Sequence, residues 1–396
     1  MGAEMASLAP GRAVGPYDSP MTRCLTRRVV PLCGLLTGLL AGQLPHVTSV
    51  AHAQPSPTRP RAVADEIVRQ ATSARLGNGS SLSDVAALSE TDVWAVGQEG
   101  IWDVWQNRGV VTRWDGRSWT EVGARGDVTG VGPLRSISAV SATELWVVGD
   151  GHDGVPYIGK GGRGGFDRVI VPAVRGGDWL RAVAAQPGRV VTVGSRGGRS
   201  LIATGAGSWT ATIGPAGALH GVALSGKDGW AVGDTGSRPL VMRLTGSGWK
   251  SVSVPAIKGG YLRDVYLQSA KRAVAVGGVF HGEEGIEPLI LRWDGKRWTK
   301  DELPIAEAEL YGVTGDGEGG FWASGYDPAR PDEAFLVKFT GRRWEPLRGE
   351  PATSQRTVRL QAVTRIGDLT MAVGHVLDKA NRYGDLVETF GPAAER

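Results

Sequence analysis

The hydrophobic positions of this chain recur as short apolar stretches that end in glycine. The first is Val93-Trp94-Ala95-Val96-Gly97, and the equivalent glycines further on are Gly149, Gly194, Gly233, Gly277, Gly325 and Gly374. Short apolar stretches that alternate with Gly-containing turns predict β-strands, and no helical period follows Gln70. We therefore expect an all-β protein.

Seven units share this pattern, and each opens with a leucine. The seven leucines are Leu82, Leu134, Leu180, Leu219, Leu262, Leu310 and Leu360, at spacings of 39 to 52 residues. Each unit has room for four short strands. The first starts at the leucine, the second ends in the glycine, the third closes a hairpin, and the fourth opens with an aromatic residue such as Trp119 or Trp298. Repeats of this length predict the blades of a propeller or the coils of a solenoid.

The seventh unit stops after its third strand, 385–390, because the chain ends at Arg396. Residues 65–70 precede Leu82 much as a fourth strand precedes each later leucine. An N-terminal strand can therefore complete the last unit and remove the exposed sheet edges of an open array. We predict a seven-bladed β-propeller over residues 63–391, closed by that strand.

Two segments carry a family resemblance. The turn 112–119, Thr-Arg-Trp-Asp-Gly-Arg-Ser-Trp, is repeated in 291–299. The strand order resembles kelch-type blades, and the turn resembles the Asp-box of sialidase-like propellers, although Gly116 follows Asp115 without a spacer. The pattern is also similar to the Trp-rich repeats of secreted bacterial propellers. The resemblance implies a fold and gives Asp115 and Asp294 a turn-stabilising role, but it implies no activity.

The N-terminal 53 residues have the pattern of an export signal. Arg23, Arg27 and Arg28 precede the apolar run 29–44, and Ala51-His52-Ala53 forms a small-x-small cleavage site. Met21 is a possible true start, and residues 54–62 form a Pro-rich leader. We expect a secreted protein, extracellular or associated with the cell wall, with no membrane span in its mature chain.

Composition narrows the chemistry further. Both cysteines, Cys24 and Cys33, lie in the export segment, so the mature chain would have no disulfide and no thiolate site. It would keep 40 basic and 38 acidic side chains, from 44 and 40 in the whole chain. Such a balance favours no nucleic-acid partner. We expect a monomer without a cofactor or a metal.

One face of the predicted propeller carries the candidate binding residues. The loops between second and third strands open on this face, and they are longest in units five, six, seven and one, at about eight to twelve residues. Trp102, Trp105 and Trp179 have no place in the repeat and suit a sugar ring or a protein partner. The alternative is that each covers a local apolar cluster.

A second candidate set is the residue that follows each opening leucine. These residues are Ser83, Arg135, Arg181, His220, Arg263, Tyr311 and Gln361. At the start of the innermost strands they should surround the mouth of the central channel. Arginine and histidine there suit a carboxylate or phosphate ligand. The alternative is pairing with nearby acids such as Asp84, Asp178 and Asp264.

Two functions fit these patterns. We expect a non-enzymatic binding propeller for an extracellular protein or polysaccharide, because no motif has catalytic spacing. The alternative is a glycan hydrolase or lyase that uses His281, Glu283, Asp327 and His375 from the loops of different blades. A sialidase-like arginine trio with Tyr311 as nucleophile would need family motifs that the chain lacks.

Overall fold

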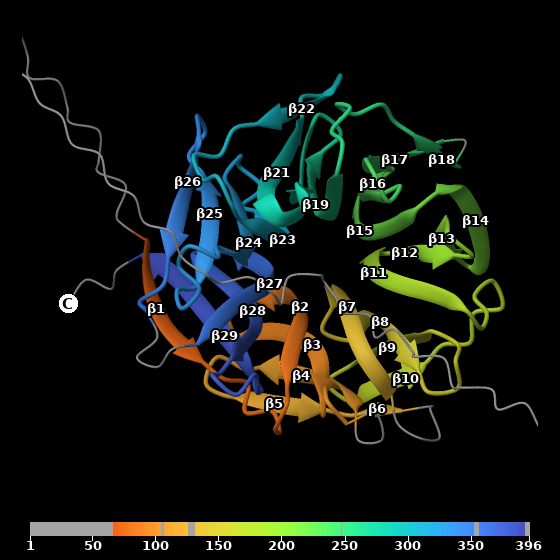
Figure 1. Ribbon diagram of the computed structural model, residues 1–396. Helices are drawn as coiled ribbons and strands as arrows, with labels where there is room; N and C mark the ends of the chain where they lie inside the picture. The colour runs from red at the N-terminus through yellow and green to blue at the C-terminus, as the bar shows by residue number, and fades with distance from the viewer. Residues whose placement is uncertain (1–65, 104–106, 126–130, 247, 352–355, 393–396) are drawn as a thin grey trace, which may run out of the picture. The chain divides into compact units, whose positions relative to one another are not determined.

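The computed structural model describes residues 66–103, 107–125, 131–246, 248–351 and 356–392. The export signal and the Pro-rich leader lie outside these residues. The described strands belong to one compact unit, Val63–Arg396. Within it, seven sheets follow one another as blades around a central axis (Figure 1), the arrangement that surrounds the central channel of a β-propeller. The prediction of an all-β, seven-bladed propeller is confirmed.

The inner strand of every blade contains the repeat leucine. These strands are β2 (Ser81–Ser89), β7 (Val131–Ser141), β11 (Asp178–Gln186), β15 (Ala218–Ser225), β19 (Gly260–Ser269), β23 (Glu309–Gly315) and β27 (Thr357–Ile366). All seven leucines are fully buried. Each inner strand contacts the inner strand of the next blade, and β27 contacts β2, so the ring is continuous.

The second and third strands form the hydrophobic middle of each blade. The second strands are β3 (Asp92–Glu99), β8 (Glu144–Gly151), β12 (Arg189–Arg196), β16 (Asp228–Asp234), β20 (Arg272–Phe280), β24 (Phe321–Tyr326) and β28 (Leu369–Leu377). The third strands are β4 (Arg108–Trp114), β9 (Tyr157–Gly162), β13 (Arg199–Ala206), β17 (Pro239–Thr245), β21 (Ile286–Trp293), β25 (Phe335–Phe339) and β29 (Tyr383–Pro392).

The outer strands are short and begin at or next to the aromatic residue of the repeat in blades one to six. They are β5 (Trp119–Val122), β10 (Gly165–Arg168), β14 (Ser208–Ala216), β18 (Gly248–Ser251), β22 (Trp298–Asp301), β26 (Trp344–Arg348) and, in blade seven, β1 (Glu66–Thr72). Blade two has a fifth strand, because β6 (Ala124–Arg125), in the link from blade one, pairs in parallel with β10. The sequence pattern did not indicate this strand.

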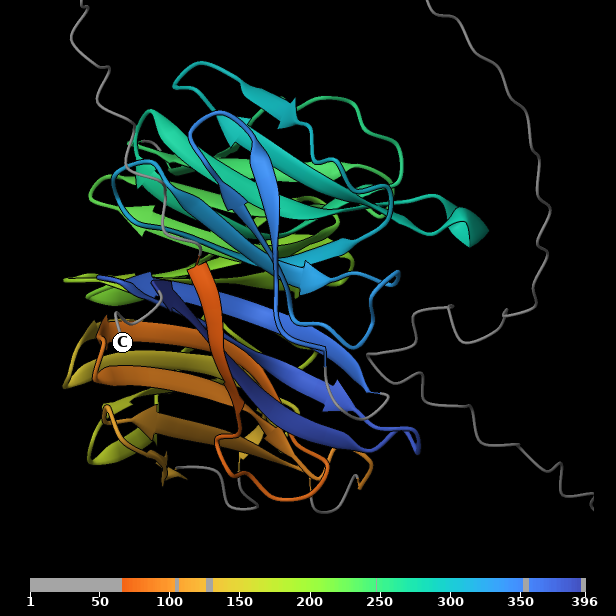
Figure 2. The same ribbon diagram turned by 90° about the vertical axis from the view of Figure 1, so that its left-hand side faces the viewer.

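The N-terminal strand closes the ring, as predicted. β1 runs antiparallel to β29, with Ile67 opposite Gly391 and Thr72 opposite Val387. Figure 2 shows the two strands side by side, although they come from opposite ends of the chain. Blade seven therefore has four strands in the order β1-β29-β28-β27. The closure leaves no inner edge unpaired at the junction of the two chain ends.

Indole rings fill the space between blades. Trp94 of blade one meets the edge of Phe166 from blade two, with ring centres 5.9 Å apart. Trp230 of blade four lies 5.0 Å from both Trp293 and Trp298 of blade five. Each such ring removes a large apolar area from water. The repeat tryptophans therefore hold adjacent blades together.

The described residues include a short 3-10 helix, η1 (Gly282–Glu284), at the tip of the β20–β21 hairpin. Figure 2 shows this hairpin projecting beyond the neighbouring blades. No helix in the described part of the chain is long and apolar enough to cross a membrane.

Candidate functional site

Each inner strand carries a β-bulge at the same place, directly after its first leucine. In blade four, Leu219 pairs with Gly233, and the ladder then skips His220. A Cβ atom on Gly233 would lie 2.0 Å from the carbonyl oxygen of Ala218, far inside van der Waals contact. The glycine that ends the apolar stretch of every second strand is therefore needed because the bulged backbone packs against it.

A bulge re-aims the side chain that it leaves unpaired. The skipped residues are Ser83, Arg135, Arg181, His220, Arg263, Tyr311 and Gln361. They occupy equivalent positions on the innermost strands, around one mouth of the channel. Residues just before the leucines and just after the glycines join them there. We call the following set the collar: Arg135, Asp150, Trp179, His220, Asp234, Tyr261, Arg263, Glu309, Tyr311, Tyr326, Arg359 and His375.

The collar begins in blade two with a buried ion pair. Arg135 is 9% exposed and donates two hydrogen bonds to the Asp150 carboxylate, one of them 2.6 Å long. Its guanidinium also lies 5.5 Å from the ring centre of Trp179 in blade three. Trp179 in turn meets the edge of His220 at 5.8 Å. Contacts thus run unbroken from blade two to blade four.

His220 makes a hydrogen bond through Nε2 to Asp234, 2.8 Å away. Burial lowers the pKa of His220 below its ordinary value of 6.5, although Asp234 opposes this effect. The imidazole is therefore neutral near neutral pH, with its proton on Nε2. Its Nδ1 atom is buried and has no hydrogen-bond partner within the described residues.

Blades five and six meet at a carboxylate. The hydroxyl groups of Tyr261 and Tyr311 donate to the two oxygens of Glu309, at 2.7 and 2.8 Å. Arg263 lies 3.2 Å from the same carboxylate and 4.8 Å from the Tyr261 ring centre. Burial raises the pKa of both tyrosines, and the negative charge of Glu309 adds to the effect. Tyr311 therefore stays protonated, which argues against a role as nucleophile.

The collar continues into blade seven with Arg359. Its guanidinium carbon lies 4.5 Å from the ring centre of Tyr326. Its cross-strand partner His375 accepts or donates a 3.0 Å hydrogen bond between Nδ1 and the Ser81 hydroxyl. Tyr383 packs against His375 at 4.9 Å.

Tyr383 connects the collar to an exposed indole. The Trp102 ring meets Tyr383 with ring centres 5.5 Å apart, and Trp102 itself is 69% exposed. Sequence reasoning nominated Trp102 but missed Arg359, Tyr326 and Tyr383. Their positions in the repeat could have indicated two of them, since Arg359 precedes a repeat leucine and Tyr326 follows a repeat glycine.

Two nominated residues lie on strands instead of in loops. Trp179 is the residue before Leu180 on β11, and its backbone carbonyl packs against Gly194, so it does occupy a repeat position. His375 is part of β28 and only 7% exposed. We expected both residues in loops. The strands are longer than the apolar stretches, because β11 begins before Leu180 and β28 continues after Gly374. Trp105 lies outside the described residues.

The same strand extension shortens three loops that were expected to be long. Only five residues, 281–285, separate β20 from β21, and only five, 378–382, separate β28 from β29. The loop of blade one has eight residues, 100–107, where about a dozen were expected, and that of blade six has the expected eight, 327–334. This face is therefore uneven because β-hairpins project from it, and not only because its loops differ in length.

The residues nominated for catalysis do not converge. Glu283 is exposed in η1, and His281 beside it bonds to Glu287 at 3.1 Å. Asp327 is 3% exposed, forms an ion pair with Arg348 and accepts the Ala329 N–H at 2.9 Å. Each carboxylate belongs to its own hairpin and has a local structural partner or faces solvent.

Burial sets the charge of His375. Burial, together with the nearby charge of Arg359, lowers the pKa of His375 from 6.5 to about 3. The ring is therefore neutral at any pH near 7 and cannot act as a general base with matched pKa. Within the described residues, no three His, Cys, Asp or Glu side chains are grouped to hold a metal ion.

Deeper in the channel, acids tie neighbouring blades together. Asp84 accepts the Ile137 N–H from the next blade at 2.9 Å, and Asp264 accepts the Val313 N–H at 2.9 Å. They were expected to pair with the arginines of the ring, but their main bonds are to backbone. The positive charge of Arg181 lowers the pKa of both acids, against the effect of burial. Arg135, His220 and Arg263 pair instead with Asp150, Asp234 and Glu309, while Asp178 pairs with Arg196.

Burial also changes the charge of these acids. It raises the pKa of Asp264 to about 7, and the nearby charge of Asp84 adds to the effect. The pKa of Asp84 is raised for the same reason.

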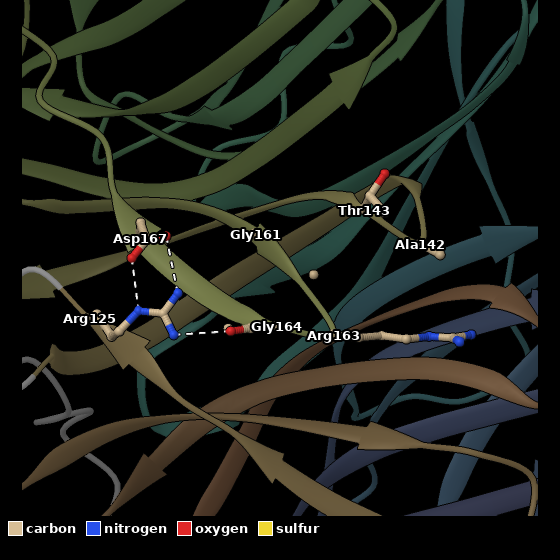
Figure 3. A pocket seen from close by; sticks show the side chains of 9 residues that line it. Arg125, Ala142, Thr143, Gly161, Arg163, Gly164 and Asp167 are labelled. Atoms are coloured by element: carbon tan, nitrogen blue, oxygen red, sulfur yellow. Dashed lines mark hydrogen bonds and ion pairs between the residues drawn. The ribbon is translucent and has the colours of Figure 1, made fainter.

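Two hollows lie away from the collar. Figure 3 shows the first, in blade two, where Arg125 turns to Asp167 and to the Gly164 carbonyl. Its charged groups already have partners, because Arg125 pairs with Asp167 and Arg163 pairs with Asp92 of blade one. The second, of about 810 Å³, lies beside the turns 316–320 and 339–341 at the opposite end of the blades.

Comparisons with known proteins agree with this architecture. No protein-family model matches the chain, and no curated protein matches its sequence. A solved structure titled "YCF48 bound to D1 peptide" aligns with 84% of this chain and 99% of that chain, with 15% identity and a TM-score of 0.54. The WD40 β-propeller domain of Doa1 aligns with 83% of this chain and 98% of that chain, with 12% identity and a TM-score of 0.55. At these identities the likeness concerns the fold alone, and it marks the chain as a seven-bladed β-propeller.

Proposed function

We propose that this protein is an exported, non-enzymatic binding propeller that takes an extracellular protein or polysaccharide on the face bearing the collar. The observation that carries the proposal is Trp102. Its indole is 69% exposed and continues, through Tyr383, into a buried polar collar that spans six of the seven blades. A large exposed aromatic side chain beside a rigid polar surface is typical of a binding site.

The ionisable groups support binding over turnover. A general acid or base needs a pKa near the working pH and a reactive atom within reach. The pKa of His375 is about 3, and the carboxylate of Asp327 is occupied by Arg348. Burial keeps Tyr311 protonated. Fixed, neutralised groups of this kind recognise a ligand without taking protons from it.

The finer resemblance to Asp-box and kelch-type propellers belongs to the same proposal. It is supported by the two repeated turns. Asp115 accepts the N–H groups of Arg117 and Ser118, both at 2.8 Å. Asp294 likewise accepts those of Lys296 and Arg297, at 2.7 and 2.8 Å. Both aspartates thus hold turns at the end of the blades away from the collar, as the resemblance implies.

A binding assay with extracellular material tests the proposal. Purified protein is immobilised and exposed to cell-wall and culture fractions, and the retained material is compared between wild type and Trp102→Ala. Loss of a central aromatic anchor should weaken binding by roughly tenfold or more. Ile213→Ala, which removes another exposed apolar side chain from β14 in blade three, is the matched control.

Two results would contradict the proposal. The first is that wild type retains nothing from either fraction. The second is that Trp102→Ala and Ile213→Ala retain as much as wild type. Turnover of a glycan, abolished by Glu283→Gln or Asp327→Asn without loss of folding, would favour the enzymatic alternative.

A further inference from the structure

The arginines of the collar are paired with carboxylates except in blade seven. Arg135 pairs with Asp150 and Arg263 with Glu309, while the neutral His220 forms a hydrogen bond with Asp234. Arg359 is the exception. Among the described residues, no carboxylate lies within ion-pair distance of it, and its buried Nε atom has no hydrogen-bond partner.

The residues around Arg359 fix the orientation of its charged guanidinium group. Its guanidinium packs on the Tyr326 ring at 4.5 Å, which fixes the plane of the fork. Glu309, the nearest collar acid that acts on it, is already occupied by two tyrosine hydroxyls and Arg263. A half-buried guanidinium without a counter-ion is costly, and a ligand carboxylate that reaches it would recover that cost.

An aromatic path leads from Arg359 to solvent. His375, the cross-strand partner of Arg359, contacts Tyr383 at 4.9 Å, and Tyr383 contacts Trp102 at 5.5 Å. Side-chain contacts in blades six, seven and one therefore connect the Arg359 guanidinium, through the buried His375 and through Tyr383, with the exposed Trp102 ring.

We propose that this surface binds an acidic polysaccharide, with a uronic-acid carboxylate on Arg359 and a neighbouring sugar ring stacked on Trp102. The proposal rests on the binding function proposed above and names its ligand. A uronic acid residue combines a carboxylate with a rigid ring that has an apolar C–H face. Those are the two features that the guanidinium and the indole accept.

A protein partner fits this surface less well. Protein interfaces gain most of their affinity from clustered anchors in a desolvated centre. In blades six, seven and one, Trp102 is the one large apolar side chain that is exposed among the described residues. The other aromatic groups of the path, Tyr326, Tyr383 and His375, carry polar atoms. A polar surface with a single exposed ring is better matched to a sugar chain.

The test measures binding of polygalacturonate, neutral dextran and poly-L-glutamate to the full chain by isothermal titration. Wild type should bind polygalacturonate, more weakly as salt rises, and should not bind dextran. Arg359→Gln should weaken this binding about tenfold or more, since one charge-assisted contact is lost. Arg359→Lys, which keeps the charge but not the fork, should bind with intermediate affinity.

Arg272→Gln is the matched control, because it removes an exposed arginine at the start of β20, beside the hollow at the opposite end of the blades. It should bind polygalacturonate like wild type. Unfolding curves of each variant show whether a loss of binding reflects a loss of structure. If Arg359→Gln is destabilised, the polygalacturonate affinity of Arg359→Lys is compared with that of wild type instead.

The outcomes separate this inference from the proposed function. If wild type binds none of the three polymers, or if Arg359→Gln binds polygalacturonate as tightly as wild type, the acidic-sugar inference is wrong. If poly-L-glutamate binds equally well, the surface recognises acidic peptides and the sugar class is wrong. In each case the loss of retained material in Trp102→Ala still decides the proposed function independently.

Discussion

Asp385 and Ser80 are 305 residues apart in the sequence and form two hydrogen bonds with each other. The Ser80 hydroxyl donates to the Asp385 carboxylate at 3.2 Å, and the backbone N–H of Asp385 donates to the Ser80 hydroxyl at 3.1 Å. The other carboxylate oxygen accepts the Ala74 N–H at 2.5 Å and the Ser73 hydroxyl at 2.9 Å. A single buried carboxylate thus fastens the segment that follows the closing strand β1.

Asp385→Ala should lower the free energy of unfolding by about 2–4 kcal/mol, because it leaves several buried donors without an acceptor. Guanidinium denaturation measures the loss. Asp385→Asn keeps one acceptor oxygen and should lose less. An alanine variant with the midpoint of wild type would show that the closure does not depend on this residue.

The repeat glycines should tolerate no side chain. In Gly233→Ala the new methyl group would meet the Ala218 carbonyl oxygen, so the blade must open or the bulge must be lost. We expect a loss of about 3 kcal/mol or more in the free energy of unfolding. Gly164→Ala is the control, since a Cβ atom there meets nothing within 4 Å. Equal stability of the two variants would contradict the bulge argument.

Asp327 should be structural. Asp327→Asn leaves Arg348 with only the more distant Glu333, 3.6 Å away. We expect a loss of about 1–3 kcal/mol in the free energy of unfolding, measured in urea. Glu283→Gln, at the exposed tip of η1, should change stability by less than about 0.5 kcal/mol. A stable Asp327→Asn variant would argue that this carboxylate is kept for another role.

Stability should depend on pH through the channel acids. Burial raises the pKa of Asp264 to about 7 from its ordinary 3.8. Between these values the folded chain holds a proton that the unfolded chain has released. The stability that this proton contributes is complete below about pH 4 and is lost as the pH rises through about 7.

Asp264→Asn removes this titration. The melting temperature of the variant should therefore rise relative to wild type as the pH is raised from about 5 to about 8. Glu388, whose pKa burial also raises to about 7, titrates in both proteins and cancels in the comparison. A constant difference between the two proteins over this range would mean that Asp264 is ionised throughout.

The repeat pattern was sufficient to predict the propeller. The leucine at each strand start, the glycine at each second-strand end and the aromatic residue of the fourth strand are local signals, and each recurs often enough to establish a register. The split of blade seven between the chain ends followed from counting strands, and β1 beside β29 confirms it. Strand β6 was missed because two residues carry no pattern.

The candidate site could be predicted only in part. Positions at the channel mouth followed from the repeat, so the seven bulged residues were found. Their partners were not found, because Glu309 comes from the blade after that of Arg263, and a sequence does not show which neighbouring acid a bulged arginine reaches. Arg359 was missed because nothing local marks the absence of a counter-ion.

The sequence by itself determined the number of blades, the order of the four repeat strands in each blade and the bulged residues at the channel mouth, since these follow from periodicity and from backbone requirements at glycine. Only the tertiary structure decided the chemistry of that mouth. Burial and contacts between blades make His375 neutral, keep Tyr311 protonated and leave Arg359 without a counter-ion. Desolvation depends on every neighbour in space, and most of these neighbours lie in other repeats.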